Sequence, residues 1–361
     1  MFDLLFTGFA IFGLAAAWVM FWSTKYFARP EPDSIEFART ADNWRLALLR
    51  YRPSGESKKN LPVILCHGLA SNALTWDPDI SHSLARHLAY AGYEVFAVEL
   101  RGRGFSDRPR LFSTQKYGWD FDTYLNIDLP ALIHRVKELT GKDQVHWAGH
   151  SMGGNLIYTY LGWHDQSVIR SATAIASSLD YSDSKSAYHR LARLRKYTRI
   201  KSVYFIMTLQ KLEIPFVGRI ANKVERFLFW EKNMNADLIR KFYAHCFCDI
   251  SNPVLHQKAT LFHKGGIRSA DESISYFQGL KNIRTPMLSI CGAKDSQCPP
   301  DATKKTHDAI EGCPKKFLEF GKAVGHKEEY GHFDLIVGEN SKHEVWPEIL
   351  AWLDKYDTAE P

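Results

Sequence analysis

The chain has 361 residues, of which 45% are hydrophobic and 24% charged, as in an ordinary folded protein that buries a core. This composition excludes wholesale disorder, and six cysteines in a chain of this length exclude a small disulfide-rich domain. The formal net charge of +6 is too small to indicate a nucleic-acid partner by itself. The length predicts one large domain with an insertion, or two domains.

The first 29 residues are expected to form a membrane anchor and a linker. No residue from 4 to 22 is charged, and a helix of that length rises about 28 Å, close to the hydrocarbon thickness of a bilayer. Aromatic residues gather near its end, as at a membrane interface: Trp18, Trp22 and Tyr26. A cleaved signal peptide is the alternative, but its usual basic start is missing, since Asp3 is the only early charged side chain.

Two basic residues, Lys25 and Arg29, follow the apolar stretch. Positive charge after a membrane span favours a cytoplasmic location for what comes next. The sequence therefore predicts a single-pass transmembrane helix with the catalytic domain on the cytoplasmic side, although the orientation stays open.

Strand and helix patterns alternate along most of the remaining chain. Eight short runs have the apolar or alternating pattern of strands: 34–40, 44–51, 62–66, 94–98, 144–148, 168–175, 286–291 and 316–320. Helical spacing occurs at 80–91, 121–139, 152–163, 301–310 and 344–355, with a kink expected at Pro130. This alternation predicts an α/β fold, with a mostly parallel sheet and helices on both of its faces.

The alternation stops between residues 179 and 280, which we interpret as a helical insertion into a core formed by residues 30–178 and 281–361. Residues 181–232 contain twelve Lys or Arg and four Asp or Glu, a local net charge of +8. This segment fits contact with an anionic bilayer, an ordinary solvated helix face or, less well, an acidic substrate. No nucleic-acid recognition motif accompanies the charge, so no nucleic-acid partner is expected.

The residues Gly149-His150-Ser151-Met152-Gly153 match the pattern G-x-S-x-G between an expected strand and an expected helix. At such a turn the serine side chain projects above the sheet, and the glycines leave room where a β-carbon would collide with backbone. The pattern predicts that Ser151 is a nucleophile. A glycine-rich turn without chemistry is the alternative.

A serine nucleophile needs hydrogen-bond donors for the oxyanion that develops during attack. His67 and Gly68 follow the strand at 62–66, and such a turn exposes the backbone N–H of Leu69. The second donor is expected to be the N–H of Met152, at a helix N-terminus where N–H groups are unpaired. The His67 side chain is expected to support the turn and not to act as the base.

The nucleophile also needs a base, and the base needs an acid that orients it. Asp295 follows the strand at 286–291 and is expected to be this acid, with a turn or helix-cap aspartate as the alternative. Two histidines that follow the strand at 316–320 compete for the role of base. His332 is preferred because an apolar segment follows it and could anchor its loop, whereas His326 lies beside three charged residues, 327–329.

These motifs resemble those of the α/β-hydrolase superfamily, in its lipase and esterase branch, over about residues 34–178 and 281–355. Residues 67–69 with Trp76, and residues 330–334, are similar to patterns in acid lipases and in polyhydroxyalkanoate-synthase-like proteins. The synthases use cysteine at the nucleophile turn, so the serine here favours hydrolysis over polymer synthesis. The resemblance implies the α/β-hydrolase fold, a cap formed by the insertion, and these site residues: Ser151, Asp295 and His332 as a triad, with Leu69 and Met152 as oxyanion donors.

The sequence therefore predicts a serine hydrolase that cleaves carboxylic esters, with lipophilic acyl esters at a membrane as the expected substrates. An acyltransferase could use the same triad, since water or an alcohol can take the acyl group. A membrane-tethered binding protein with a vestigial triad is a further alternative. No cofactor or metal is expected: His245, Cys246 and Cys248 lack zinc-site spacing, and Gly102 and Gly104 do not extend to a nucleotide-binding motif.

Overall fold

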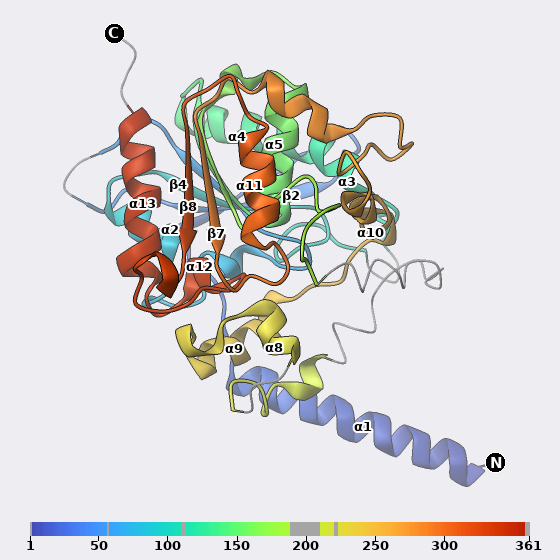
Figure 1. Ribbon diagram of the computed structural model, residues 1–361. Helices are drawn as coiled ribbons and strands as arrows, with labels where there is room; N and C mark the ends of the chain where they lie inside the picture. Colours follow the sequence, from blue (N-terminus) through green and yellow to red (C-terminus); the bar gives the residue numbers. More distant parts are fainter. Residues whose placement is uncertain (1, 56–57, 110–112, 188–209, 220–222, 358–361) are drawn as a thin grey trace.

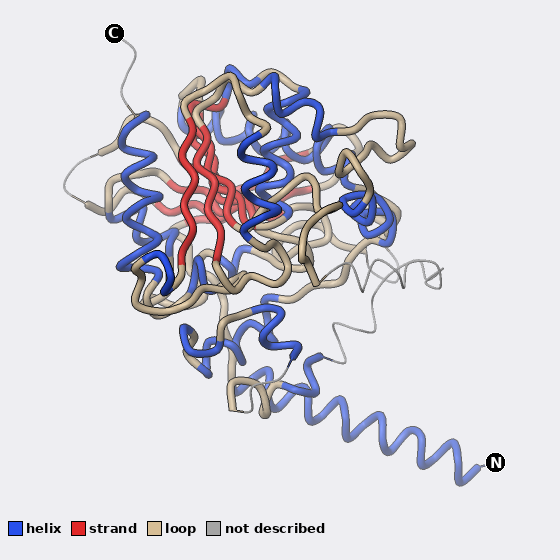
Figure 2. The backbone as a smooth tube through the Cα atoms, in the orientation of Figure 1, coloured by secondary structure: helices blue, strands red, loops and turns tan. Residues whose placement is uncertain are grey.

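The structure is a computed structural model that describes residues 2–55, 58–109, 113–187, 210–219 and 223–357. An eight-stranded sheet lies at its centre, in the order β1-β2-β4-β3-β5-β6-β7-β8 (Figure 2). β2 is antiparallel to both β1 and β4, and every other neighbouring pair is parallel, which confirms the expected mostly parallel sheet. The strands are β1 (Ser34–Arg39), β2 (Arg45–Tyr51), β3 (Val63–Cys66), β4 (Val95–Glu99), β5 (Val145–His150), β6 (Ile169–Ile175), β7 (Met287–Gly292) and β8 (Lys315–Phe320).

Helices cover both faces of the sheet (Figure 1). One face carries α2 (Leu84–Tyr90) and α13 (Ser341–Tyr356), and the other carries α4 (Leu129–Thr140), α5 (Met152–Trp163) and α11 (Pro300–Asp308). Along β2, Ala47 and Leu49 join the core under α2 and α13, whereas Leu46 and Leu48 join the core under α4 and α5. Successive side chains of a strand point to opposite faces, so a sheet that is covered on both faces needs nearly continuous apolar strands.

The helix expected at 121–139 consists of three segments. These are α3 (Phe121–Thr123), the π-helical η2 (Tyr124–Asp128) and α4. The N–H of Leu129 bonds to the carbonyl of Tyr124, five residues earlier, which makes the middle segment wider than an α-helix. Pro130 follows this wider segment closely, as the second residue of α4. The irregularity lies immediately before Pro130, and a kink at that residue remains a prediction.

The N-terminal helix α1 (Phe2–Lys25) does not support the transmembrane span expected from its sequence. Among the described residues, none of the helices combines the length and apolar character that crossing a bilayer requires. The end of α1 instead contacts the protein: the indole N–H of Trp18 donates to the carbonyl of Leu212 (3.2 Å), and Trp22 packs against the core. Trp18 and Trp22, which the sequence analysis assigned to a membrane interface, thus contact the rest of the protein.

The described residues between β6 and β7 form short helices joined by turns and loops, with no strand among them. Its helices are η5 (Lys211–Glu213), α8 (Lys223–Leu228), η6 (Glu231–Asn233), α9 (Ala236–Lys241), η7 (Phe242–Cys246), α10 (Asn252–Lys258), η8 (Ala259–Phe262) and η9 (Tyr276–Asn282). Of these, η5 and η7 contact α1, and α8 and α9 lie outside the two helical layers (Figure 1). The basic cluster at residues 190–201 lies outside the described residues. The domain boundaries at 29, 178 and 280 remain predictions.

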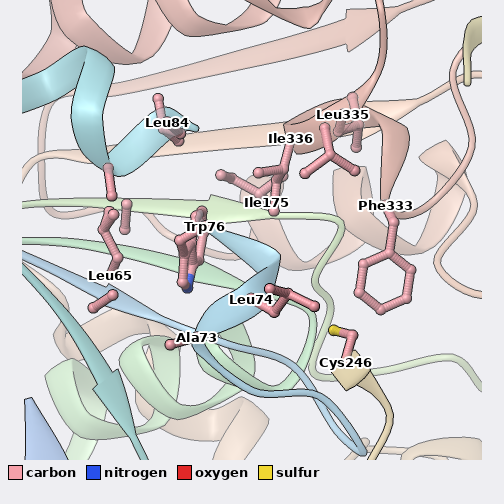
Figure 3. Close-up of a cluster of buried hydrophobic side chains, with 14 of the residues drawn as sticks. Leu65, Ala73, Leu74, Trp76, Leu84, Ile175, Cys246, Phe333, Leu335 and Ile336 are labelled. Carbon is pink, nitrogen blue, oxygen red and sulfur yellow. The ribbon is translucent and has the colours of Figure 1, made fainter. Parts of the chain in front are cut away.

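An apolar cluster connects several loops at the carboxyl ends of the strands (Figure 3). It includes Leu65 of β3, Ile175 of β6, Leu74 of η1 (Ala73–Thr75), and Leu335 and Ile336 of α12 (Asp334–Val337). All five side chains are buried. The loops after β3 and β8 therefore rest on one shared core, which fixes the positions of the residues that they carry.

Candidate active site

Ser151 occupies the sharp turn between β5 and α5. Its backbone has φ 52° and ψ −112°, a strained conformation for a residue with a side chain. A β-carbon on Gly149 would lie 2.3 Å from the backbone of Gly153, and one on Gly153 would lie 2.3 Å from the carbonyl oxygen of Cys66. The two glycines are therefore required by close backbone approach on both sides of the serine.

Hydrogen bonds hold the strained turn in place. The N–H of Ser151 donates to the carbonyl of Ile175 (2.8 Å), and the hydroxyl of Ser177 donates to the carbonyl of Ser151 (2.8 Å). Both partners belong to the end of β6 and the loop that follows. The neighbouring strand thus offsets the strain at Ser151, which keeps its half-buried side chain in a fixed place.

The loop after β3 approaches the serine directly. A β-carbon on Gly68 would lie only 3.0 Å from the β-carbon of Ser151. In the part of the chain that the structure describes, no acceptor lies against the backbone N–H of Leu69 or that of Met152. Met152 is the first residue of α5, where N–H groups have no partner within the helix. Both N–H groups are available to an oxygen atom from a ligand.

The His67 side chain is occupied by its own loop. Its Nδ1 donates to the carbonyl of Gly68 (2.8 Å), and its Nε2 accepts from the N–H of Leu100 (3.3 Å). This pattern requires a neutral imidazole, and burial lowers the pKa of His67 to about 3. His67 thus links the loops after β3 and β4 and has no nitrogen left for proton transfer.

Asp295 and His332 lie together, although 37 residues separate them in the chain. His332 Nδ1 lies 2.7 Å from Asp295 Oδ2, and each residue is only 3% exposed. The other carboxylate oxygen of Asp295 accepts from the backbone N–H of Gln297 (2.8 Å) and of Cys298 (2.9 Å). These bonds fix the carboxylate, and the carboxylate in turn fixes one tautomer and one orientation of the imidazole.

His150 connects this pair to the serine turn, a role that sequence analysis missed. Its ring lies 4.6 Å from the ring of His332, between centroids, and its Nε2 donates to the backbone carbonyl of His332 (3.1 Å). Among the described residues, no hydrogen bond joins the Ser151 hydroxyl to the His332 imidazole. Catalytic hydrogen bonds are often long when no substrate is bound. Ser151, Asp295 and His332 thus belong to one site, in which the hydrogen bond between Ser151 and His332 is not formed.

A second residue whose role was missed is Asp334, which sequence analysis named only within the 330–334 pattern and the apolar segment after His332. It is fully buried and accepts from the N–H of Gly331 (2.9 Å) and of Trp230 (3.0 Å). Burial raises the pKa of Asp334 to about 7. Its place in the 330–334 pattern, two residues after His332, was the available signal in the sequence.

The other residues considered from sequence have structural contacts. His326 Nδ1 accepts from the N–H of Gly321 (3.2 Å), and its ring lies 4.5 Å from that of Phe320. His245 Nε2 donates to the carbonyl of Ser23 (2.9 Å). No group of three metal-ligating side chains occurs within the described residues.

A family model described as the alpha/beta hydrolase fold matches residues 62–339, so this chain belongs to the α/β-hydrolase fold family. The chain is 26% identical to "Lipase 3" of Drosophila melanogaster, over 91% of this chain and 92% of the relative. It is 20% identical to "Poly(3-hydroxyalkanoate) polymerase subunit PhaC" of Haloarcula marismortui, over 90% of this chain and 70% of the relative. The esterase RhEst1 from Rhodococcus sp. ECU1013 shares the fold, with a TM-score of 0.57, 18% identity, and 90% and 99% coverage.

The family and the alignment with lipases over most of both chains identify the protein as a carboxylic-ester hydrolase of the lipase and esterase type. This confirms the resemblance drawn from the motifs. The similarity to the polymerase subunit PhaC agrees with the second part of that resemblance, to synthase-like proteins.

Proposed function

We propose that this enzyme cleaves carboxylic esters of lipophilic acyl groups through a Ser151–His332–Asp295 triad and an acyl-enzyme intermediate. The observation that carries the proposal is the buried 2.7 Å contact between His332 Nδ1 and Asp295 Oδ2, beside the strained turn at Ser151. A carboxylate that accepts the Nδ1 proton leaves the lone pair of Nε2 free to accept a proton from the serine.

The residues would act in sequence. His332 Nε2 takes the hydroxyl proton of Ser151 while the serine oxygen attacks the ester carbonyl. The carbonyl oxygen becomes negatively charged and accepts hydrogen bonds from the N–H groups of Leu69 and Met152. His332 then gives its proton to the departing alcohol, and the acyl group remains on the serine. Water, deprotonated by His332, attacks this ester and releases the acid.

Ester turnover by the variant Ser151→Ala tests the proposed nucleophile. We expect hydrolysis of a short p-nitrophenyl ester to fall at least a thousandfold, on the order of what loss of a serine nucleophile costs. The N–H groups and the Asp295–His332 contact do not involve the serine hydroxyl, so the variant should keep its melting temperature. Retention of most of the activity would reject Ser151 as nucleophile.

The acceptor of the acyl group needs a separate test, because an alcohol could replace water in the second step. We expect the free acid to be the main product when a primary alcohol competes with water. Predominant formation of the new ester would identify an acyltransferase, and absence of both products would favour a binding protein.

We also propose that the enzyme meets its substrate at a lipid surface, with contact but without a membrane span. Support comes from large apolar side chains that are more than half exposed on α1 and the insertion: Phe9, Ile11, Phe12, Leu14, Met20, Phe21 and Phe216. Moving exposed apolar groups of this kind from water into a lipid interface lowers the free energy. The location of the enzyme in the cell remains a prediction.

Liposomes that contain long-chain esters test this contact. The double variant Phe9→Ser and Phe12→Ser removes two rings that are each 75% exposed, so we expect its fold to be unchanged. Its hydrolysis of liposomal esters should fall several-fold, while hydrolysis of a soluble short ester stays constant. Ile80→Ser, at an 81% exposed position before α2, is the matched control and should change neither rate. Equal liposomal rates for all three proteins would reject the proposed contact.

A further inference from the structure

The two loops that carry Asp295 and His332 bind the same short segment of the insertion, residues 227–233. In the loop after β7, the side-chain amide of Gln297 donates to the carbonyl of Phe227 (2.8 Å). In the loop after β8, the N–H of Phe333 donates to the carbonyl of Leu228 (3.1 Å). One stretch of backbone therefore bridges two loops that leave different strands. We call residues 227–233 the strap.

Asp334 strengthens the bridge on the His332 side. Its Oδ1 accepts from the N–H of Trp230 (3.0 Å) in the strap, and its Oδ2 accepts from the N–H of Gly331 (2.9 Å). The amide of Asn233 lies 3.4 Å from the second oxygen. A single buried carboxylate thus ties the residue before His332 to the strap.

The packing between the strap and the His332 loop leaves no room for a shift. A β-carbon on Gly331 would lie 2.8 Å from the backbone nitrogen of Trp230. The rings of Phe229 and Phe333 are 5.6 Å apart, and Phe333 also faces Cys246 of η7 (Figure 3). Close contact of this kind allows one arrangement of the loop, because well-packed interiors do not deform continuously.

The far end of the strap is anchored as well. Asn233 is fully buried, its carbonyl accepts from the N–H of Glu339 (2.8 Å), and its side-chain oxygen accepts from the side-chain amide of Asn340 (2.8 Å). Both partners lie in the short connection between α12 and α13. The strap is therefore held on both sides of the residues that touch the Asp295 and His332 loops.

Burying a carboxylate without a cationic partner costs free energy unless hydrogen bonds satisfy its oxygens. The neighbours of Asp334 are backbone N–H groups and the neutral Asn233, and no lysine or arginine among the described residues forms an ion pair with it. The free-energy cost of burying Asp334 is therefore offset by its hydrogen bonds to Trp230 and Gly331, which also fix the loop that precedes α12.

We propose that Asp334 and the strap are positioning elements that hold His332 against Asp295, so that the insertion completes the active site. This proposal rests on the proposed triad. Loss of the link would let the His332 loop move, and the fraction of molecules with the His332–Asp295 contact would fall. Substrate binding in the remaining molecules would be unchanged, so the loss should fall on kcat and not on KM.

The variant Asp334→Asn tests the proposal, since its amide removes one of the two acceptor oxygens. We expect kcat for a soluble short ester to fall about tenfold or more, with KM changed less than about twofold. In Asn233→Ala, which keeps the titratable Asp334 carboxyl, the midpoint of the pH profile for inactivation by a fluorophosphonate should also shift, because His332 loses part of its contact with Asp295.

Asp77→Asn is the matched control. Asp77 is also a buried carboxylate, and it accepts from the Tyr51 hydroxyl (2.8 Å) and from Arg86 (2.8 Å), but its partners belong to neither loop. This variant should lower the melting temperature and leave kcat and the pH midpoint unchanged.

Two outcomes would overturn the proposal. One is that Asp334→Asn lowers only the melting temperature, as the control does. The other applies if that variant does not fold: Asn233→Ala then decides, and an unchanged kcat and pH midpoint in it would reject the strap. A wild-type enzyme that does not react with the fluorophosphonate would instead reject the proposed triad, which distinguishes the two failures.

Discussion

Two loops at the carboxyl ends of sheet strands each bury a histidine, one after β3 and one after β8. His67 uses both ring nitrogens for backbone partners, Gly68 and Leu100. His332 gives Nδ1 to a carboxylate, and among the described residues nothing bonds its Nε2. Burial is therefore a poor guide to chemistry at this edge of the sheet. Whether Nε2 has a hydrogen-bond partner of its own decides whether the histidine can take up a proton.

The largest expected effect in this comparison comes from Asp295→Asn. The asparagine oxygen can still accept from the N–H groups of Gln297 and Cys298, so the loop should keep its shape. Its NH2 group, however, would face His332 Nδ1 and favour the wrong tautomer. We expect kcat to fall by about a thousandfold or more, measured with a soluble ester. A fall of less than tenfold would contradict the role of Asp295.

A smaller effect, on stability, is expected for His67→Asn. Because burial lowers the pKa of His67 from 6.5 to about 3, the unfolded chain binds a proton in this range that the folded chain does not. His67 therefore makes the folded state lose stability as the pH falls from about 6.5 to about 3. His67→Asn has no imidazole at this position, so it lacks this pH-dependent contribution to the free energy of unfolding.

Urea unfolding at several pH values measures the difference. The wild type should be more stable than His67→Asn at pH 7, by about 1–3 kcal/mol for the lost acceptor, and the gap should narrow on acidification. A gap that stays constant from pH 7 to pH 4 would show that His67 is not neutral in the fold.

The smallest effect is expected for the other histidine beyond β8, His326. Its contacts are with Gly321 and the ring of Phe320, so its removal should cost about 1 kcal/mol or less. We expect His326→Ala to keep kcat within about twofold of the wild-type value in a steady-state assay. A loss as large as that of His332→Ala would reverse the choice between the two histidines.

The sheet was predictable because its buried strands are continuous apolar runs bounded by turns. The ends of all eight strands lie within one or two residues of the expected positions. The helix at Met152–Trp163 was predicted to the residue, since a glycine-rich turn marks its start. The π-helical segment at Tyr124–Asp128 was not, because a shift of one residue in hydrogen bonding leaves the apolar spacing of the sequence almost unchanged.

The N-terminal helix shows a different limit of sequence analysis. A run of residues without charge predicted a membrane span there, but such a run can also pack against protein. Contacts of Trp18 with Leu212, almost two hundred residues away, decide between these for the end of the helix. Such contacts carry no local pattern.

Sequence analysis located three candidate residues but not what holds them together. Ser151, Asp295 and His332 were found because each follows a strand with a recognisable turn. The contact between His150 and the carbonyl of His332 spans 182 residues, and the bond from Trp230 to Asp334 spans 104. Tertiary packing creates both contacts, and no local sequence pattern indicates either of them.

The most direct test of the account locates the adduct formed with a fluorophosphonate by mass spectrometry of the intact enzyme and its peptides. The account predicts one adduct per chain, on the peptide that contains Ser151, with a labelling rate reduced at least a hundredfold in His332→Ala. An adduct on another residue, or labelling at the wild-type rate without the His332 imidazole, would contradict it.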